Sequence, residues 1–248
     1  MKDSQFRRAS VTAPVQEFWD LTRLTVSDGN KSTRSAIAID HPSFYVGFSI
    51  VVLSCILYIP FLSLPLLPDD YLQVTLGRKF GHWQGWPSLL NDPLFRNRTT
   101  SLILTYWTDL LFPFSRLAFG TSSILLHATN GLLVYALGTA RSIGWRLSAI
   151  TAIVFVLQER HHEAVIWYAA LPELLMSFFV LCCLLLWIRW LRSPIFSFGL
   201  WLGILTCFVL AQLSKESAVA AIFLMIALAV VERASLRRVV AGLSPLAS

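Results

Sequence analysis

Three short polar stretches carry most of the side chains in this sequence that could take part in chemistry. They are Pro-Asp-Asp-Tyr-Leu at 68–72, Glu-Arg-His-His-Glu at 159–163 and Ser-Lys-Glu-Ser at 214–217. Each stretch lies at the end of a long apolar run, where a charged group loses part of its hydration. Ionisable groups in that position are candidates for function: carboxylates as general bases, and cations as partners for phosphate.

Asp69 and Asp70 are the candidates for acid–base chemistry in the first stretch. Neighbouring side chains point in different directions on a helix or a strand, so only one of the two can face a given reacting atom. That carboxylate would serve as a general base or grip a cation that neutralises phosphate. The alternative is helix capping: Pro68 sets the turn, and one aspartate accepts N–H groups at the start of a helix running toward Phe80.

The second stretch contains adjacent histidines, His161 and His162. The sequence has no His-x-x-x-His or Cys-x-x-Cys pattern beside them, so a structural zinc site is not indicated. His161 and Glu163 are instead candidates for the wall of a wet pocket beneath Trp167, which is expected at the membrane interface. The alternative is a solvated turn with internal ion pairs.

In the third stretch, Lys215 is a point charge suited to an anionic group, above all phosphate, and Glu216 adjoins it. The alternative is a solvated corner between two helices.

Two polar residues lie inside an apolar run rather than at its end. His127 and Asn130 are three residues apart, so on a helix they share a face. We expect both to make interhelical hydrogen bonds, with Gly131 allowing close packing.

Long apolar segments must position these residues. The chain has 248 residues, of which 56% are hydrophobic and 14% charged, more apolar side chain than one soluble core can hide. A membrane-spanning helix needs about 20 residues, and the pattern predicts an all-α, polytopic membrane protein with about six such helices. The predicted spans lie near 44–64, 117–139, 143–158, 171–191 and 195–213, with a last one that follows 214–217 and ends near 231.

Charge predicts the orientation. Residues 1–43 read as a cytoplasmic tail, 44–231 as the membrane domain with a long helical outer loop at 65–115, and 232–248 as a second cytoplasmic tail. On the side of the N-terminus the connections carry arginines, whereas nearly all carboxylates fall on the other side. The net charge of +6 therefore orients the chain in the bilayer and does not indicate nucleic acid. The three polar stretches would meet at the external face.

The order of these features resembles the glycosyltransferase C superfamily, membrane enzymes that take sugars from polyprenyl-phosphate carriers. The chain is most similar to the transmembrane O-mannosyltransferase-like proteins, often joined to tetratricopeptide repeats, and to their bacterial relatives. The resemblance rests on PDDYL, LLHATNGLLVYAL, HHEAVIWYAALPELL and LSKESAV, and covers roughly residues 44–231. Where the family commonly has His-Pro and Tyr-Arg-Pro, this chain has Gln158-Glu159 and Phe95-Arg96-Asn97. It is also short for the family, so we expect a minimal or incomplete member.

The resemblance implies an inverting sugar transfer at the outer face of a membrane, here expected to be the bacterial cytoplasmic membrane. Asp69 would be the general base, and Asp70 would position the acceptor or a loop helix. Arg96 and Lys215 would stabilise the phosphate that leaves. The pocket around the donor would be shaped by His161, Glu163 and Glu216. The donor would be a polyprenyl-phosphate-linked sugar, with a protein or a glycan as acceptor; a divalent cation is left open.

Two other functions are compatible with the sequence. The chain could be a non-catalytic membrane scaffold or a degenerate transferase fragment, in which the polar stretches only hold helices together. A transporter is less favoured, because the ionisable groups lie at helix ends and transporter sites usually lie near the bilayer midplane.

Overall fold

The computed structural model describes residues 41–141 and 143–243, and the regular structure within these ranges is helical, without a strand. Residues 1–40 of the predicted N-terminal tail and 244–248 of the C-terminal tail lie outside the described residues.

Among the described residues, three helices are long and apolar enough to cross a membrane. Helix α2 (His41–Tyr58) continues into the 3-10 turn η1 (Ile59–Ser63), and α6 (Arg116–Ala140) and α9 (Leu171–Arg192) are the other two. Their bounds agree with three of the predicted spans to within a few residues. The agreement arises because each of these segments is predominantly apolar over about 20 residues, the length that a membrane-spanning helix needs.

The other apolar helices are shorter. They are α7 (Trp145–Leu157), α10 (Phe198–Gln212) and α11 (Ala221–Val231), and the last follows the 3-10 turn η4 (Glu216–Ala220). At 1.5 Å per residue, the 13 residues of α7 extend about 20 Å, less than the roughly 30 Å of a hydrocarbon layer. The prediction of six spans therefore stays a prediction.

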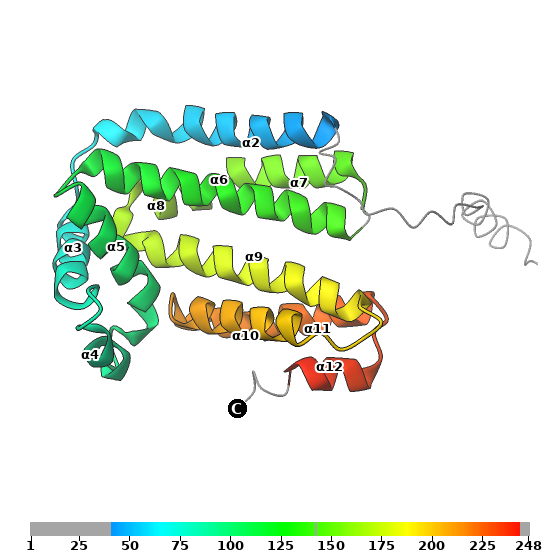
Figure 1. The fold of residues 1–248 in the computed structure, drawn as a ribbon. Coiled ribbons are helices and arrows are strands. Elements are labelled where there is room, and N and C mark those ends of the chain that lie inside the picture. The colour runs from blue at the N-terminus through cyan, green and yellow to red at the C-terminus, as the bar shows by residue number, and fades with distance from the viewer. Residues whose placement is uncertain (1–40, 142, 244–248) are drawn as a thin grey trace, which may run out of the picture. The chain divides into compact units, whose positions relative to one another are not determined.

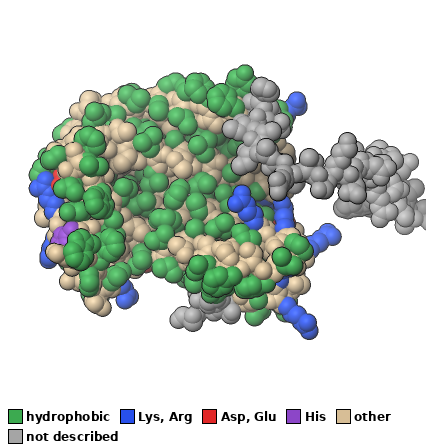
Figure 2. Space-filling view, in the orientation of Figure 1, with side chains coloured by type: hydrophobic (Ala, Val, Ile, Leu, Met, Phe, Trp, Pro, Cys, Tyr) green, Lys and Arg blue, Asp and Glu red, His purple; other side chains and the backbone are tan. Residues whose placement is uncertain are grey.

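Helix α9 is the centre of the unit formed by residues 40–248, since it packs against α6, α10 and α11, while α2 packs on α6 and α7 (Figure 1). Trp187 of α9 is fully buried and donates a hydrogen bond of 2.8 Å to the carbonyl of Met225 on α11. The face seen in Figure 2 carries many hydrophobic side chains. Phe48, Ile150 and Phe223 are among the exposed apolar residues. An apolar surface of this extent is typical of a protein surrounded by lipid.

A layer of short helices covers one end of the long ones (Figure 1). Gln73 and Thr105 join two of its members, because the Gln73 amide donates to the Thr105 hydroxyl at 3.2 Å. The segment between η1 and α6, predicted as a helical loop, supplies most of this layer. The members of the layer are α3 (Pro68–Phe80), α4 (Trp86–Asn91), η2 (Arg96–Arg98), α5 (Thr99–Leu111), α8 (Arg160–Ile166) and η3 (Tyr168–Ala170). Helix α12 (Leu236–Leu243) lies at the opposite end.

Gly81 allows α3 and α5 to approach closely. A Cβ at this position would lie 2.3 Å from the Cβ of Tyr106 and 2.6 Å from the carbonyl oxygen of Leu102. Gly81→Ala is therefore expected to lower the free energy of unfolding by about 1–3 kcal/mol. Gly199→Ala is the matched control, since a Cβ there would meet nothing within 4 Å. Thermal unfolding of the purified protein in detergent measures both; equal effects would contradict the close packing.

An ion pair joins the same two helices and gives a pH dependence. Arg78 donates to Asp109 from Nε at 2.5 Å and from Nη2 at 3.1 Å, and the Phe114 N–H donates to the same carboxylate at 3.0 Å. Burial acts to raise the pKa of Asp109, but these hydrogen bonds and the Arg78 charge outweigh it and hold the pKa below its ordinary value.

A lowered pKa in the folded state means that the unfolded chain binds the proton more tightly. The stabilisation is therefore complete above the unfolded pKa of about 3.9 and is lost as the pH falls through the folded value. Asp109→Asn should remove this part of the acid-induced loss of stability. The check is the melting temperature of both proteins from neutral pH down to about pH 3; an unchanged acid dependence in the variant would contradict the assignment.

Candidate functional site

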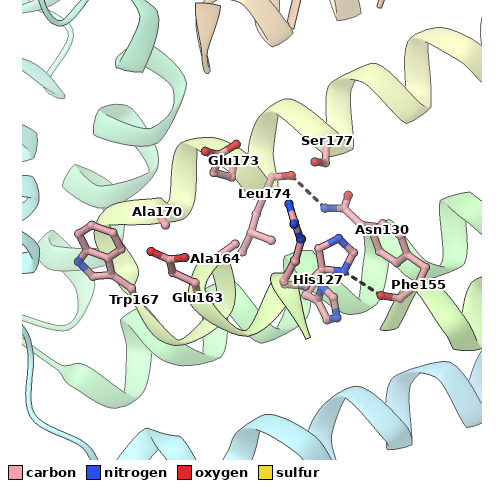
Figure 3. A pocket seen from close by; sticks show the side chains of 12 residues that line it. His127, Asn130, Phe155, Glu163, Ala164, Trp167, Ala170, Glu173, Leu174 and Ser177 are labelled. Carbon is pink, nitrogen blue, oxygen red and sulfur yellow. Dashed lines mark hydrogen bonds between the residues drawn. The ribbon is translucent and has the colours of Figure 1, made fainter. Parts of the chain in front are cut away.

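Two adjoining cavities lie at the end of the bundle that the short helices cover. The main cavity has a volume of about 340 Å³ and lies between α6, α7, α8 and α9 (Figure 3). The side cavity, of about 190 Å³, lies between η2, α9 and the segment that leads into η4. Their walls have three residues in common, Trp167, Ala170 and Glu173, so they adjoin.

The second and third polar stretches line adjoining cavities. Lys215 donates to the carboxylate of Glu173, which joins the segment before η4 to the first turn of α9. Nearby, the Thr100 hydroxyl lies 2.7 Å from that of Ser214. Lys215 and Glu216 line the side cavity, and His161 and Glu163 line the main one. Segments far apart in the chain therefore converge here.

Asp70 ties the first polar stretch to the same place. It is buried, and its Oδ2 accepts the Leu67 N–H at 2.8 Å, which caps the start of α3. Its Oδ1 accepts the N–H of Ala169 at 2.8 Å, and Ala169 lines the side cavity. The capping alternative is thus confirmed for one aspartate of the pair.

Asp69 occupies the first turn of the same helix, but its surroundings are different. Its side chain is exposed, lines neither cavity, and has no hydrogen-bond or ion-pair partner within residues 41–141 and 143–243. A carboxylate with unoccupied lone pairs, one residue from a buried anchor, is free to accept a proton from an incoming group.

The inner wall of the main cavity is built by helix-to-helix hydrogen bonds. His127 Nε2 lies 3.4 Å from the carbonyl of Val156. Asn130 donates to the carbonyl of Leu174 at 3.0 Å (Figure 3). The interhelical bonds predicted for both residues are confirmed. A Cβ on Gly131 would lie 2.8 Å from Val156, which confirms the close packing as well.

Two polar atoms of the residues in this wall have no hydrogen-bond partner among the described residues. His127 Nδ1 and Asn130 Oδ1 are buried and have no hydrogen-bond partner in the described part of the chain. Glu163, Glu173 and Trp167 lie together at the other side of the cavity (Figure 3). The cavity therefore offers hydrogen-bonding groups on two sides, as a polyhydroxylated ligand would require.

Some predicted residues are not where the sequence suggested, and others were missed. Arg96 is exposed and lines neither cavity, whereas Arg98, two residues later, lines the side cavity. Arg160 lines the main cavity. Trp167 lies in the walls of both cavities, and its buried Nε1 has no partner among the described residues. Its predicted position at the membrane interface stays a prediction.

An apolar groove of about 240 Å³ runs beside the main cavity. It lies between α7, α9 and the η4–α11 segment, with Met176, Leu184 and Leu224 in its walls. Phe155 and Ser177 belong to the walls of both the groove and the main cavity. The polar main cavity therefore adjoins the apolar groove.

Within the described ranges, no group of three or more His, Cys, Asp or Glu side chains is placed to hold a metal ion. The Arg and Lys side chains in the walls of the two cavities are those of Arg98, Arg160 and Lys215. Comparison of the chain with protein-family models, with curated proteins and with solved structures finds no match.

Proposed function

We propose that the chain is an integral membrane glycosyltransferase-like protein that transfers a sugar from a polyprenyl-phosphate carrier to an acceptor hydroxyl at the external membrane face. The observation that carries this proposal is the polar cavity beside an apolar groove. The donor has the same two parts, a sugar phosphate that needs polar partners and a hydrocarbon chain that needs an apolar surface. Six membrane crossings with a cytoplasmic N-terminus would put the cavities on the outer side. The connections that contain Arg141 and Arg192 would then be cytoplasmic, as expected for arginine-rich connections.

The cations of the site suit the phosphate that leaves. As the glycosidic bond breaks, negative charge develops on the phosphate oxygen, and charged hydrogen-bond donors lower the energy of that transition state. Arg160 in the main cavity is placed to supply such a donor, and Lys215 stands at its boundary. Lys215 already balances Glu173, so we assign the larger part to Arg160.

The sugar would lie near the boundary of the cavities. Trp167 offers an apolar ring and an unpartnered N–H, and the carboxylates of Glu163 and Glu173 can accept hydrogen bonds from sugar hydroxyls. The acceptor would approach from the solvent side, where Asp69 is exposed.

The proposed step conserves atoms and charge. The acceptor oxygen attacks the anomeric carbon and forms the new glycosidic bond while the bond from that carbon to the phosphate oxygen breaks. The proton of the acceptor hydroxyl passes to the Asp69 carboxylate, and the electron pair of the broken bond stays on the phosphate. The products are the glycosylated acceptor with inverted configuration and polyprenyl phosphate.

The proposal is tested by sugar transfer in liposomes that contain the purified chain and polyprenyl-phosphate-linked sugars. Leu224→Trp would fill the groove and is expected to reduce transfer about tenfold, the loss of roughly 1.4 kcal/mol of donor binding. Leu202→Trp, an exposed position on α10 outside the groove, is the matched control and should leave transfer unchanged. A folded protein without transfer from any such donor would favour the scaffold alternative.

A further inference from the structure

The end of the bundle opposite the candidate site is rich in positive charge (Figure 2). Its one carboxylate within the described ranges, Glu232, accepts two hydrogen bonds of 3.0 Å from Arg192 and lies 3.4 Å from Arg141. The arginines at this end are Arg141, Arg146, Arg189, Arg192, Arg233, Arg237 and Arg238. Most of their charge is therefore not balanced by the described part of the chain.

A cavity of about 280 Å³ lies at this end, between the last turn of α9, the α9–α10 connection and α12. Arg238 fixes α12 beside it by donating to the carbonyls of Leu191 at 3.0 Å and Pro194 at 3.3 Å. The backbone of α12 also lies close against the bundle, since a Cβ on Gly242 would be 2.4 Å from the Trp187 ring. The cavity is thus a built feature and not a gap beside a loose helix.

Three polar groups in its walls could hold an anion. Trp190 is only 3% exposed, and its indole Nε1 has no hydrogen-bond partner among residues 41–141 and 143–243. A buried N–H without an acceptor is unfavourable, so a small shift of the Trp190 ring that lets this N–H reach an acceptor in the cavity would be stabilising. The walls also contain the exposed Arg237, whose guanidinium has no partner in the same ranges, and Ser235.

Helix α12 runs beside one end of the bundle, roughly parallel to α10 and α11 (Figure 1), and its outward face is apolar. Leu236 and Val240 are exposed apolar residues four apart, so they form one lipid-facing stripe, and Arg237 adjoins them. Phe196 extends the apolar surface next to the cavity. An occupant would therefore meet cations and hydrocarbon-compatible side chains together.

We infer that this cavity binds the headgroup phosphate of an anionic phospholipid, with phosphatidylglycerol as the representative case. The phosphodiester oxygens would accept hydrogen bonds from Arg237, the Trp190 N–H and the Ser235 hydroxyl, while the acyl chains lie along Leu236 and Phe196. The inference requires that the chain is embedded in a membrane, but it does not depend on sugar transfer.

Native mass spectrometry of the full chain released from mixed vesicles of phosphatidylglycerol and phosphatidylcholine tests the inference. We expect bound phosphatidylglycerol to be retained in excess over phosphatidylcholine, and Arg237→Gln to weaken that retention about tenfold through the loss of a charged hydrogen bond. Trp190→Phe should weaken it severalfold. Arg189→Gln, an exposed arginine at the same end but outside the cavity, is the matched control and should have no effect.

Two other outcomes would overturn the inference. Equal losses in Arg237→Gln and Arg189→Gln would mean general attraction to a charged surface. Displacement of the lipid by millimolar inorganic phosphate would mean a site for a free anion. Trp190 is buried, so its replacement could unfold the protein, and circular dichroism and size exclusion check that the variant is folded. Arg237→Gln changes an exposed side chain, so it tests the site even if Trp190→Phe does not fold.

Discussion

Replacement of Asp69 by asparagine is expected to reduce sugar transfer by about 10²–10⁴-fold, the usual contribution of a general base. Asparagine keeps the size of the side chain but cannot take the acceptor proton. Because Asp69 is exposed and has no partner within the described ranges, the loss should not come from unfolding. The free energy of unfolding should fall only slightly, by what one charge at a helix N-terminus contributes, about 0.3–1 kcal/mol.

Asp92→Asn is the matched control for this variant. Asp92 belongs to the same polar segment, but its carboxylate accepts hydrogen bonds only from its own loop, from the N–H groups of Leu94 at 2.8 Å and Phe95 at 3.2 Å. An asparagine oxygen can accept the same bonds, so transfer should be unchanged. Full activity of Asp69→Asn would reject Asp69 as the base.

Replacement of Asp70, unlike that of Asp69, should cause a large loss of stability. Both of its oxygens are used, one by Leu67 and one by Ala169, so Asp70→Ala leaves two N–H groups without their acceptor. At about 1–3 kcal/mol for each of the two unsatisfied groups, we expect the free energy of unfolding to fall by roughly 2–6 kcal/mol. Asp70→Asn can restore one of the two bonds and should lie between alanine and the natural residue.

The measurement for Asp70 is thermal unfolding in detergent, with transfer assayed at a temperature where each variant is still folded. Since Asp70 joins the start of α3 to η3, its loss should also let the Asp69 carboxylate move relative to the cavities. If the Asp70 variants are as stable as the natural protein, the connection between α3 and η3 is not what holds this end together.

The apolar segments were the most predictable part of this fold. The predicted spans at 117–139 and 171–191 correspond to α6 and α9, because a predominantly apolar segment of about 20 residues has few alternatives to a helix. The predicted last span is divided instead, into the 3-10 turn η4 and the 11-residue α11. Small residues at 217–221, four of them alanine or serine, gave no signal for the point at which one helix type changes to the other.

Within the site, the sequence identified the stretches but not the roles of their residues. It could not tell which aspartate of the pair is buried, because that depends on where Ala169 packs, about a hundred residues later. It also could not separate Arg96 from Arg98, since the direction of each side chain is set by the turn η2. His127 and Asn130 were predictable because a polar group inside an apolar helix must find its partner on another helix.

Photo-crosslinking with a diazirine-bearing polyprenyl-phosphate sugar most directly tests the central claim that the main cavity and the groove form one donor site. In vesicles containing the full chain, we expect label on the groove segments, around Met176–Leu184 and Ser217–Leu224, and we expect excess unlabelled donor to remove it. The Leu224→Trp variant should lose the label and Leu202→Trp should keep it. Label spread evenly over the apolar helices, or unaffected by unlabelled donor, would contradict the claim.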